Sequence, residues 1–386
     1  MKLHCDITLP ASKSESNRAL MIAAYGGFTP DFQNLSDAND TFVLSEALNN
    51  AHQGVDEINV ADCGTAARFL TTYLACRKGR WLLTGTERMK QRPMAPLVDA
   101  LRVLGADIQY VENEGCLPLR ITGKSLTGGK VSIDMTQSSQ FASSLLLAAP
   151  MFSQGIELEL FGSPSSLPYL DMTLAMMRHF SARAERQDRK VVVEPQPYQK
   201  QLFTIEPDWT AASYWYEMAA FSEECEIRLL GLGDPSTSSG ISSLQGDSII
   251  AEWMQRFGVG TCVENEALVL RKIPFEKSPL CFDFSQHPDL YPTMAATCAG
   301  LNVEASLAGL DNLTLKESNR VEAMQSELAK LGCRPLCFCA HNDHRIVMAL
   351  APFSLLFGKV VFDHPEVVKK SYPNFWKDAS FLSVRG

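Results

Sequence analysis

The hydrophobic and polar residues along the chain follow two alternating patterns. Short runs in which apolar and polar residues alternate, as in residues 2–9, predict β-strands. Longer runs that open with polar residues and continue with apolar ones, as in residues 11–24, predict α-helices. The two kinds of run take turns along the chain, which predicts the α/β fold class.

The predicted elements cover most of the chain. We expect strands at residues 2–9, 81–83, 130–133, 156–161, 191–193, 202–205, 226–230, 268–270, 302–308 and 359–362. We expect helices that begin near Ser12, Asp62, Arg92, Gln137, Leu167, Asp208, Gln245, His287, Lys316 and Asn342.

Two kinds of helix recur, which indicates a repeated structural unit. One kind is apolar and rich in small residues, as in residues 64–75, and such a helix is stable only when it is buried. The other is amphipathic and ends in Leu-Gly or Phe-Gly, as in residues 97–106. Buried helices imply sheets wrapped around them, with the polar helix starts gathered at one end.

The chain has room for about two domains, because it has 386 residues. Two places where it could pass between domains lie near residues 10–12 and 206–208. We therefore expect one domain at 12–205 and a discontinuous domain formed by 1–11 plus 206–386.

Composition and charge exclude some classes of protein. The chain is 46% hydrophobic and 20% charged, which is a globular composition. Its net charge of −9 argues against a nucleic-acid partner, since such proteins usually carry a basic face. No apolar run approaches the ~18 residues of a membrane span, and the N-terminus lacks a signal peptide. We expect a cytoplasmic protein without a membrane partner, whose eleven cysteines are reduced.

A group of cysteine and histidine residues near the C-terminal end of the sequence could suggest a metal site. Cys333, Cys337, Cys339, His341 and His344 lie close together in the sequence. The cluster has no Cys-x-x-Cys pair, and its spacing fits no standard zinc pattern. We interpret these cysteines as small buried thiols of a strand, and we expect no metal.

Positive charges at helix starts are the unusual feature of this sequence. Ser12 and Glu15 have the spacing of a capping box, yet Lys13 and Arg18 lie in or near the same first turn. The N-terminal end of a helix carries partial positive charge and disfavours cations. Bound anions would remove the conflict, because helix starts and basic side chains would then bind phosphate or carboxylate together.

The same conflict recurs along the chain, and serines and glycines accompany it. Further cations at or near helix starts are Arg68, Arg88, Arg92, Lys316, Arg320 and Arg345. Lys316 and Arg320 are four residues apart and are expected to share one helical face. Repeated violation of a local rule points to function, here an anion site.

A set of motifs occurs in a fixed order along the chain: PASKSESNRAL, DCGTAARFL, TGTERMKQRPMAPL, SSQFASSLLLAAP, SSLPYLDMTLAMM, HPDLYPTMAA, KESNRVEAM, NDHRIVMA and KKSYPNFW. As a set, and over nearly the whole chain, they resemble the 5-enolpyruvylshikimate-3-phosphate synthase family. The resemblance implies two similar domains, each of three βαβαββ units (an inside-out α/β barrel). It places the active site in the interdomain cleft.

The resemblance also implies a reaction with two anionic substrates. The 5-hydroxyl of shikimate 3-phosphate attacks phosphoenolpyruvate, and phosphate leaves, in the shikimate pathway of chorismate and aromatic amino acid biosynthesis. By motif, shikimate 3-phosphate would be held by Lys13, Ser14, Arg18, Ser138, Ser139, Gln140, Ser166, Tyr169, Asp289, Asn312 and Lys316. Phosphoenolpyruvate would be held by Lys13, Gly64, Arg92, Gln140, Arg320, Arg345 and Lys370.

Three residues receive catalytic roles from the resemblance. Asp289 would accept the proton of the attacking hydroxyl, and Glu317 with Lys13 would protonate the methylene carbon. Such chemistry needs a base and an acid within hydrogen-bond reach of the reacting atoms. The resemblance implies no metal or organic cofactor and a monomer that binds small-molecule substrates.

The sequence departs from the family pattern at several positions. Asp62 and Cys63 precede Gly-Thr where the family has other residues, and Phe69 follows Arg68 where Pro is common. Leu167 replaces the usual basic residue before Pro168. These changes lie in motifs that are expected to bind the substrates. The two residues with expected proton-transfer roles, Asp289 and Glu317, are both present.

Two alternative functions stay open at the level of sequence. One is the sister enolpyruvyl transferase that acts on UDP-N-acetylglucosamine and uses a loop cysteine as its acid, for which Cys116 is the candidate. The other is a non-catalytic, anion-binding relative. The motif around Arg92 favours the shikimate enzyme over the first, and the presence of Asp289 and Glu317 argues against the second.

Overall fold

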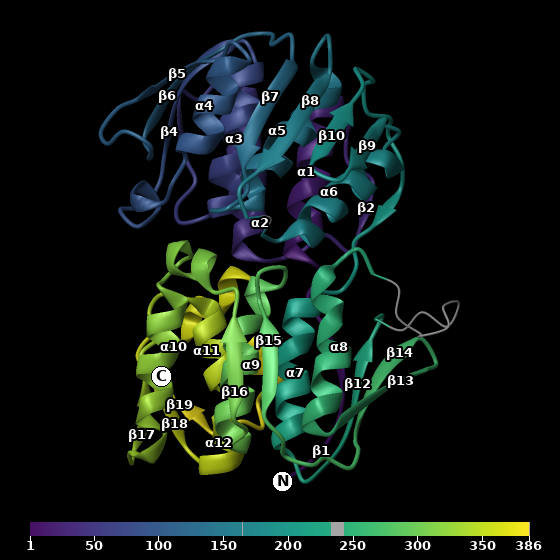
Figure 1. Cartoon of the computed structure of the whole chain (residues 1–386), viewed down its shortest axis with the longest axis vertical. Coiled ribbons are helices and arrows are strands. Elements are labelled where there is room, and N and C mark those ends of the chain that lie inside the picture. Colours follow the sequence, from purple (N-terminus) through teal and green to yellow (C-terminus); the bar gives the residue numbers. More distant parts are fainter. Residues whose placement is uncertain (164, 233–242, 386) are drawn as a thin grey trace. The chain divides into compact units, whose positions relative to one another are not determined.

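The computed structural model describes residues 1–163, 165–232 and 243–385 (Figure 1). The chain divides into two compact units. The terminal unit comprises Met1–Ser12, Ser36–Asn39 and Glu206–Gly386, and the inserted unit comprises Lys13–Leu35 and Asp40–Ile205.

The inserted unit contains six helices and ten strands among its described residues. Its helices are α1 (Lys13–Gly26), α2 (Asn39–Gln53, which starts one residue before the unit), α3 (Gly64–Cys76), α4 (Ala95–Val103), α5 (Ser139–Ala148) and α6 (Leu167–His179). Its strands are β2 (Phe32–Gln33), β3 (Glu57–Asn59), β4 (Gly79–Thr84), β5 (Asp107–Tyr110), β6 (Leu119–Gly123), β7 (Gly129–Asp134), β8 (Ile156–Phe161), β9 (Ala184–Gln187), β10 (Lys190–Val193) and β11 (Phe203–Thr204).

The terminal unit joins the two ends of the chain. Its helices are α7 (Trp209–Phe221), α8 (Ile250–Trp253), α9 (Tyr291–Leu301), α10 (Arg320–Leu328), α11 (His344–Leu350), α12 (Phe353–Phe357) and α13 (Phe375–Asp378). Its strands are β1 (Lys2–Thr8), β12 (Glu224–Leu230), β13 (Val259–Glu264), β14 (Ala267–Lys272), β15 (Leu280–Asp283), β16 (Ala305–Ala308), β17 (Leu336–Phe338), β18 (Val360–Phe362) and β19 (Val384–Arg385).

One sheet topology recurs in both units. The four-stranded sheets have the orders β3-β4-β6-β5, β7-β8-β10-β9 and β1-β12-β14-β13. In each sheet the first two strands are parallel and the remaining neighbours are antiparallel. Each sheet therefore forms one βαβαββ unit, which confirms the α/β fold class expected from the sequence. Smaller sheets pair β11 with β2 and β15 with β16, and a three-stranded sheet has the order β17-β18-β19.

Apolar helices form the core of each unit, as the sequence predicts. Every residue of α7 is buried, and α3 and α5 are buried along almost their whole lengths. Hydroxyl groups pair between α3 and α5, where Thr72 Oγ1 and Ser144 Oγ lie 2.6 Å apart. Figure 1 shows α3 and α5 within the inserted unit, with strands around them.

Helix α10 begins later than the sequence suggests. The side chain of Asn319 caps this helix by accepting a hydrogen bond from the amide of Glu322 at 3.4 Å. Lys316 therefore precedes the helix, and the expectation that it shares a helical face with Arg320 is wrong. Both residues still lie at the same helix start.

The helix expected after Gln245 is also shorter than predicted, because α8 has only four residues and lies between two 3₁₀ turns. The side chains of the turn that precedes α8 form hydrogen bonds with the first residues of α7. Gln245 accepts from the amide of Trp209 at 3.0 Å, and Asp247 accepts from the hydroxyl of Thr210 at 2.6 Å. These side-chain bonds tie the first turn to another helix.

The cysteines near residue 337 are not the buried thiols that the sequence suggests. Cys337 is exposed on β17, and Cys339 is half-buried.

Among the described residues, no helix is both long and apolar enough to cross a membrane.

Candidate active site

A buried arginine gathers three carboxylates in the terminal unit. Arg320, the first residue of α10, is 1% exposed. Its Nη1 lies 2.9 Å from Asp289 Oδ1, and its Nη2 lies 2.7 Å from Glu317 Oε2. Its Nε donates to Asp343 Oδ2 at 2.8 Å. The cluster unites the expected base, the expected acid and an expected ligand of phosphoenolpyruvate.

Asp343 connects this cluster to helix α11. Its side chain caps α11 by accepting from the amide of Arg345 at 3.0 Å. Arg345 Nη2 then lies 2.7 Å from Asp289 Oδ2, so Asp289 is held between Arg320 and Arg345. Asp343 therefore has two roles, as the cap of α11 and as a partner of Arg320.

The arginines set the charge state of Asp289. Burial raises the pKa of this carboxyl group, but the positive charges of Arg345, Lys316 and Arg320 outweigh burial and hold its pKa well below the ordinary value. Asp289 is therefore ionised at neutral pH. It is also a weak base for as long as it is paired with both arginines.

Three further expected residues lie in the same unit. Asn312 is buried in the 3₁₀ turn Asp311–Leu315, and its Oδ1 has no hydrogen-bond partner among the described residues. An unpaired buried acceptor favours a ligand donor at this point. Lys316 is close enough to Asp289 to lower its pKa, and Lys370 is buried in the 3₁₀ turn Pro365–Lys370.

In the inserted unit, a carboxylate holds Lys13 at the start of α1. Lys13 Nζ lies 2.9 Å from Oδ2 of Asp40, whose side chain is 3% exposed. Asp40 comes from the first turn of α2, a helix that the sequence analysis did not predict. The residues SDAND at 36–40 are a possible helix start and could have indicated it.

Arg18 is more deeply built into the structure than the sequence suggests. Its Nε donates to Thr173 Oγ1 at 2.7 Å, and its Nη1 donates to the carbonyl of Ser14 at 2.9 Å. Its guanidinium lies over the rings of Phe69 and Tyr169. Burial lowers the pKa of Arg18 to about 10, which still leaves it charged at neutral pH.

Two arginines lie against Gly64 at the start of α3. A Cβ atom on Gly64 would lie 2.7 Å from Nη1 of Arg92 and 2.8 Å from Nη1 of Arg68. Arg68 is fixed by bonds to the carbonyls of Gly64 and Pro93. The guanidinium of Arg92 makes only a long contact of 4.0 Å from Nη1 to the sulfur of Met89, and its buried Nε has no hydrogen-bond partner among the described residues. Arg92 is thus a buried cation with unused donors, as an anion site requires.

The remaining expected residues of the inserted unit lie at two helix starts. Ser138 caps α5 by accepting from the amide of Gln140 at 3.2 Å, and Gln140 Nε2 donates to Thr65 Oγ1 on α3 at 3.1 Å. Ser166 precedes α6 in a left-handed conformation with a φ of 59°. Cys63, one of the departures from the family pattern, caps α3 through its sulfur atom.

Comparison with known proteins identifies the family. The family model of EPSP synthase (3-phosphoshikimate 1-carboxyvinyltransferase) matches residues 32–379. A 3-phosphoshikimate 1-carboxyvinyltransferase of Bacteroides fragilis is 42% identical over 98% of this chain and 95% of the relative.

The chain belongs to the EPSP synthase family. A more distant member of the family, from Syntrophobacter fumaroxidans, is 33% identical over 97% of this chain and 96% of the relative. The fold agrees with solved EPSP synthases: one from Acinetobacter baumannii has a TM-score of 0.73 at 19% identity, covering 99% of this chain and 96% of that chain. The enolpyruvyl transferase NikO from Streptomyces tendae shares the fold, with a TM-score of 0.69 at 16% identity and coverages of 98% and 95%.

The buried cluster predicts a large effect of Arg320→Gln on stability. Removing the guanidinium leaves three carboxylates close together without their shared counter-charge, which should cost about 3–5 kcal/mol of unfolding free energy. Urea unfolding followed by tryptophan fluorescence measures this free energy. The signal reports mainly on the terminal unit, which contains Arg320, because four of the five tryptophans lie there. Arg271→Gln is the matched control, since Arg271 also bridges two carboxylates but is 37% exposed, and it should cost about 1 kcal/mol or less. Equal effects of the two substitutions would contradict the prediction.

The lowered pKa of Asp289 predicts how stability depends on pH. The unfolded chain binds a proton at Asp289 at a higher pH than the folded chain does, so this stabilisation is present at neutral pH and is lost as the pH falls. Between about pH 5 and pH 3, the unfolding free energy should fall more steeply for the wild type than for Asp289→Asn. Parallel slopes over that range would show that Asp289 is not held ionised by its arginines.

Proposed function

We propose that the protein transfers the enolpyruvyl group of phosphoenolpyruvate to the 5-hydroxyl of shikimate 3-phosphate and releases phosphate. This is the 3-phosphoshikimate 1-carboxyvinyltransferase reaction of the shikimate pathway. The observation that carries the proposal is the position of Asp289, an ionised carboxylate held by Arg320 and Arg345 beside Glu317. The Bacteroides fragilis relative of that name supports it at 42% identity.

The pairing of Asp289 with its arginines suggests how the base is activated. Phosphoenolpyruvate carries a phosphate and a carboxylate, and both compete with Asp289 for Arg320 and Arg345. Once the substrate engages the arginines, less positive charge remains on Asp289 and its basicity rises. Substrate binding thus produces the base that the reaction needs.

The proton transfers then follow a simple order. Asp289 accepts the proton of the 5-hydroxyl while the oxygen of that hydroxyl bonds to the central carbon of phosphoenolpyruvate. Glu317 and Lys13 together protonate the methylene carbon, with the ammonium group of Lys13 as the source of the proton, and the carbon becomes a methyl group in the tetrahedral intermediate. The same pair then takes a proton back from that methyl group while Asp289 returns its proton to the departing phosphate, which gives the enolpyruvyl ether. The scheme uses side chains alone, without a metal or an organic cofactor.

The remaining expected ligands divide by substrate, as the motifs imply. For phosphoenolpyruvate, Arg92 is the strongest candidate of the inserted unit, because it is buried with an unpaired Nε. For shikimate 3-phosphate, the serines at the starts of α5 and α6 and the unpaired oxygen of Asn312 offer polar groups. We propose that the protein works on these small molecules as a cytoplasmic monomer.

The sister reaction on UDP-N-acetylglucosamine is less well supported. Its loop acid would be Cys116, a half-buried residue between β5 and β6 whose pKa is raised by burial. The curated relatives reported above are named as 3-phosphoshikimate 1-carboxyvinyltransferases.

A phosphate-release assay tests the proposed reaction directly. The purified protein should release phosphate only when shikimate 3-phosphate and phosphoenolpyruvate are both present. Replacing shikimate 3-phosphate with UDP-N-acetylglucosamine should give no release. Release with the UDP-sugar, or none with the proposed pair, would refute the proposal.

The substitution Asp289→Asn should separate catalysis from binding. Asparagine keeps the shape of the side chain but cannot accept the hydroxyl proton, so kcat should fall by about 10²- to 10⁴-fold. Binding of shikimate 3-phosphate, measured by calorimetry, should change much less. Glu322→Gln, which changes an exposed carboxylate on α10, is the control and should leave kcat unchanged. Near-normal turnover in a folded Asp289→Asn protein would remove Asp289 from the base role.

The substitution Arg92→Ala should act on phosphoenolpyruvate. Losing one charge-assisted contact should cost roughly 1.5–3 kcal/mol, and kcat/KM for phosphoenolpyruvate should fall about ten- to a hundredfold. Arg88→Ala is the matched control, because Arg88 belongs to the same turn but is exposed. If both variants kept wild-type kinetics, Arg92 would not be a ligand.

A further inference from the structure

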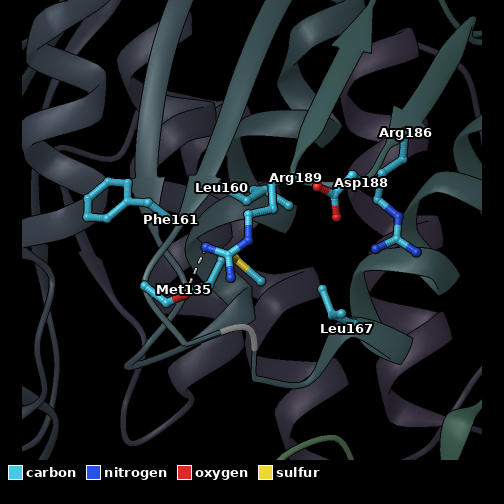
Figure 2. Close-up of a pocket in the computed structure, with 8 residues that line it drawn as sticks. Met135, Leu160, Phe161, Leu167, Arg186, Asp188 and Arg189 are labelled. Atoms are coloured by element: carbon cyan, nitrogen blue, oxygen red, sulfur yellow. Dashed lines mark hydrogen bonds between the residues drawn. The ribbon is translucent and has the colours of Figure 1, made fainter.

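The inserted unit contains a pocket of about 360 Å³ (Figure 2). Met135 follows β7, Leu160 belongs to β8, and Leu167 opens α6, and these three residues give the pocket an apolar wall. The hairpin of β9 and β10 adds Arg186 and Arg189. Two arginines beside an apolar wall are suited to an anionic ligand with a carbon skeleton.

The pocket adjoins the two loops that carry the serines expected to bind shikimate 3-phosphate. The loop after β7 leads to Ser138, and the loop after β8 leads to Ser166. A hydrogen bond from Ser165 Oγ to the carbonyl of Met135, 2.9 Å long, fastens the two loops together. Leu167, which lines the pocket, directly follows Ser166.

The two arginines of the pocket differ in their partners. Arg186 Nη2 lies 3.0 Å from Asp171 Oδ1 on α6, so its charge is already paired. Arg189 is exposed and donates only a long bond of 3.5 Å to the carbonyl of Gly162. Within the described residues, Arg189 has no carboxylate partner in an ion pair. Figure 2 shows its guanidinium in the pocket, with the bond to the backbone drawn as a dashed line.

One carboxylate opposes this positive charge. Asp188 also lines the pocket, in the turn between β9 and β10, where its φ is 52°. The planar fork of Arg189 still offers several donors, which match the oxygens of a phosphate group. A phosphate monoester carries nearly two negative charges at neutral pH, so it can attract the guanidinium despite Asp188.

We propose that Arg189 binds the phosphate group of shikimate 3-phosphate and replaces the basic side chain that Leu167 lacks. Leu167 occupies the position where the family pattern has a cation, and the hairpin supplies a cation to the same pocket from another element. Arg189 thereby makes the site select a phosphorylated acceptor over the same acceptor with a free hydroxyl. The inference rests on the proposed function and specifies one contact within it.

Steady-state kinetics of Arg189→Ala test the proposal. The KM for shikimate 3-phosphate should rise about tenfold, the lower end of the loss for a charged contact, because the guanidinium is exposed. The KM for phosphoenolpyruvate and kcat should stay near wild type. Arg183→Ala is the matched control, since Arg183 is an exposed arginine just before β9 that pairs with Glu194 at 3.1 Å, and it should change nothing.

A second substitution tests whether Leu167 and Arg189 are alternatives. Adding Leu167→Arg to the Arg189→Ala protein should lower the KM for shikimate 3-phosphate back toward wild type. An unchanged KM in Arg189→Ala would overturn the proposal, as would equal increases in the KM values of both substrates.

Calorimetric titration with shikimate 3-phosphate separates this proposal from the proposed function. If the wild type binds the compound but catalyses no phosphate release, the reaction is refuted, while weaker binding by Arg189→Ala still supports the contact. If the wild type neither binds nor turns over shikimate 3-phosphate, both proposals fall.

Discussion

The buried guanidinium of Arg320 is the interaction on which the candidate site of the terminal unit depends. A charge that is 1% exposed is tolerated only with close counter-charges, and here three carboxylates supply them. These carboxylates come from the turn before α9, the segment before α10 and the cap of α11. One arginine therefore brings together three segments that are far apart in the sequence, and it does so around the residues proposed to move protons.

The same reasoning explains why cations occur at helix starts throughout this chain. Lys13 is balanced by Asp40, and Arg345 is balanced by Asp289, so in these two cases a carboxylate offsets the unfavourable position. Arg92 differs, because it is buried and makes no ion pair with a carboxylate among the described residues. Lys13 in the inserted unit and Arg345 in the terminal unit are thus neutralised by carboxylates, whereas Arg92 in the inserted unit is buried without such a partner among the described residues.

Much of the fold could be predicted from the sequence, and several of the expected site residues do lie together in the structure, but the partners of those residues could not be predicted. Periodicity and helix punctuation predict the alternating elements and the buried helices such as α7, because these are local properties. Asp40 was missed because its role is a contact with Lys13, 27 positions earlier in the chain. The start of α10 was misplaced because Asn319 competes with the residues before it as the cap. Arg189 gives no signal in the sequence, since its pocket forms only when the hairpin meets the start of α6.

The path of the chain through the two units has a consequence for synthesis on the ribosome. Strand β1 pairs in parallel with β12, which is made about two hundred residues later. At about 5–20 residues per second, β1 waits roughly 10–40 s for its neighbour. All residues of the inserted unit are made during that interval, so this unit can fold while β1 is still unpaired. An exposed strand edge invites wrong pairing, and the charged side chains that alternate with the apolar ones in β1 help to keep it soluble until β12 arrives.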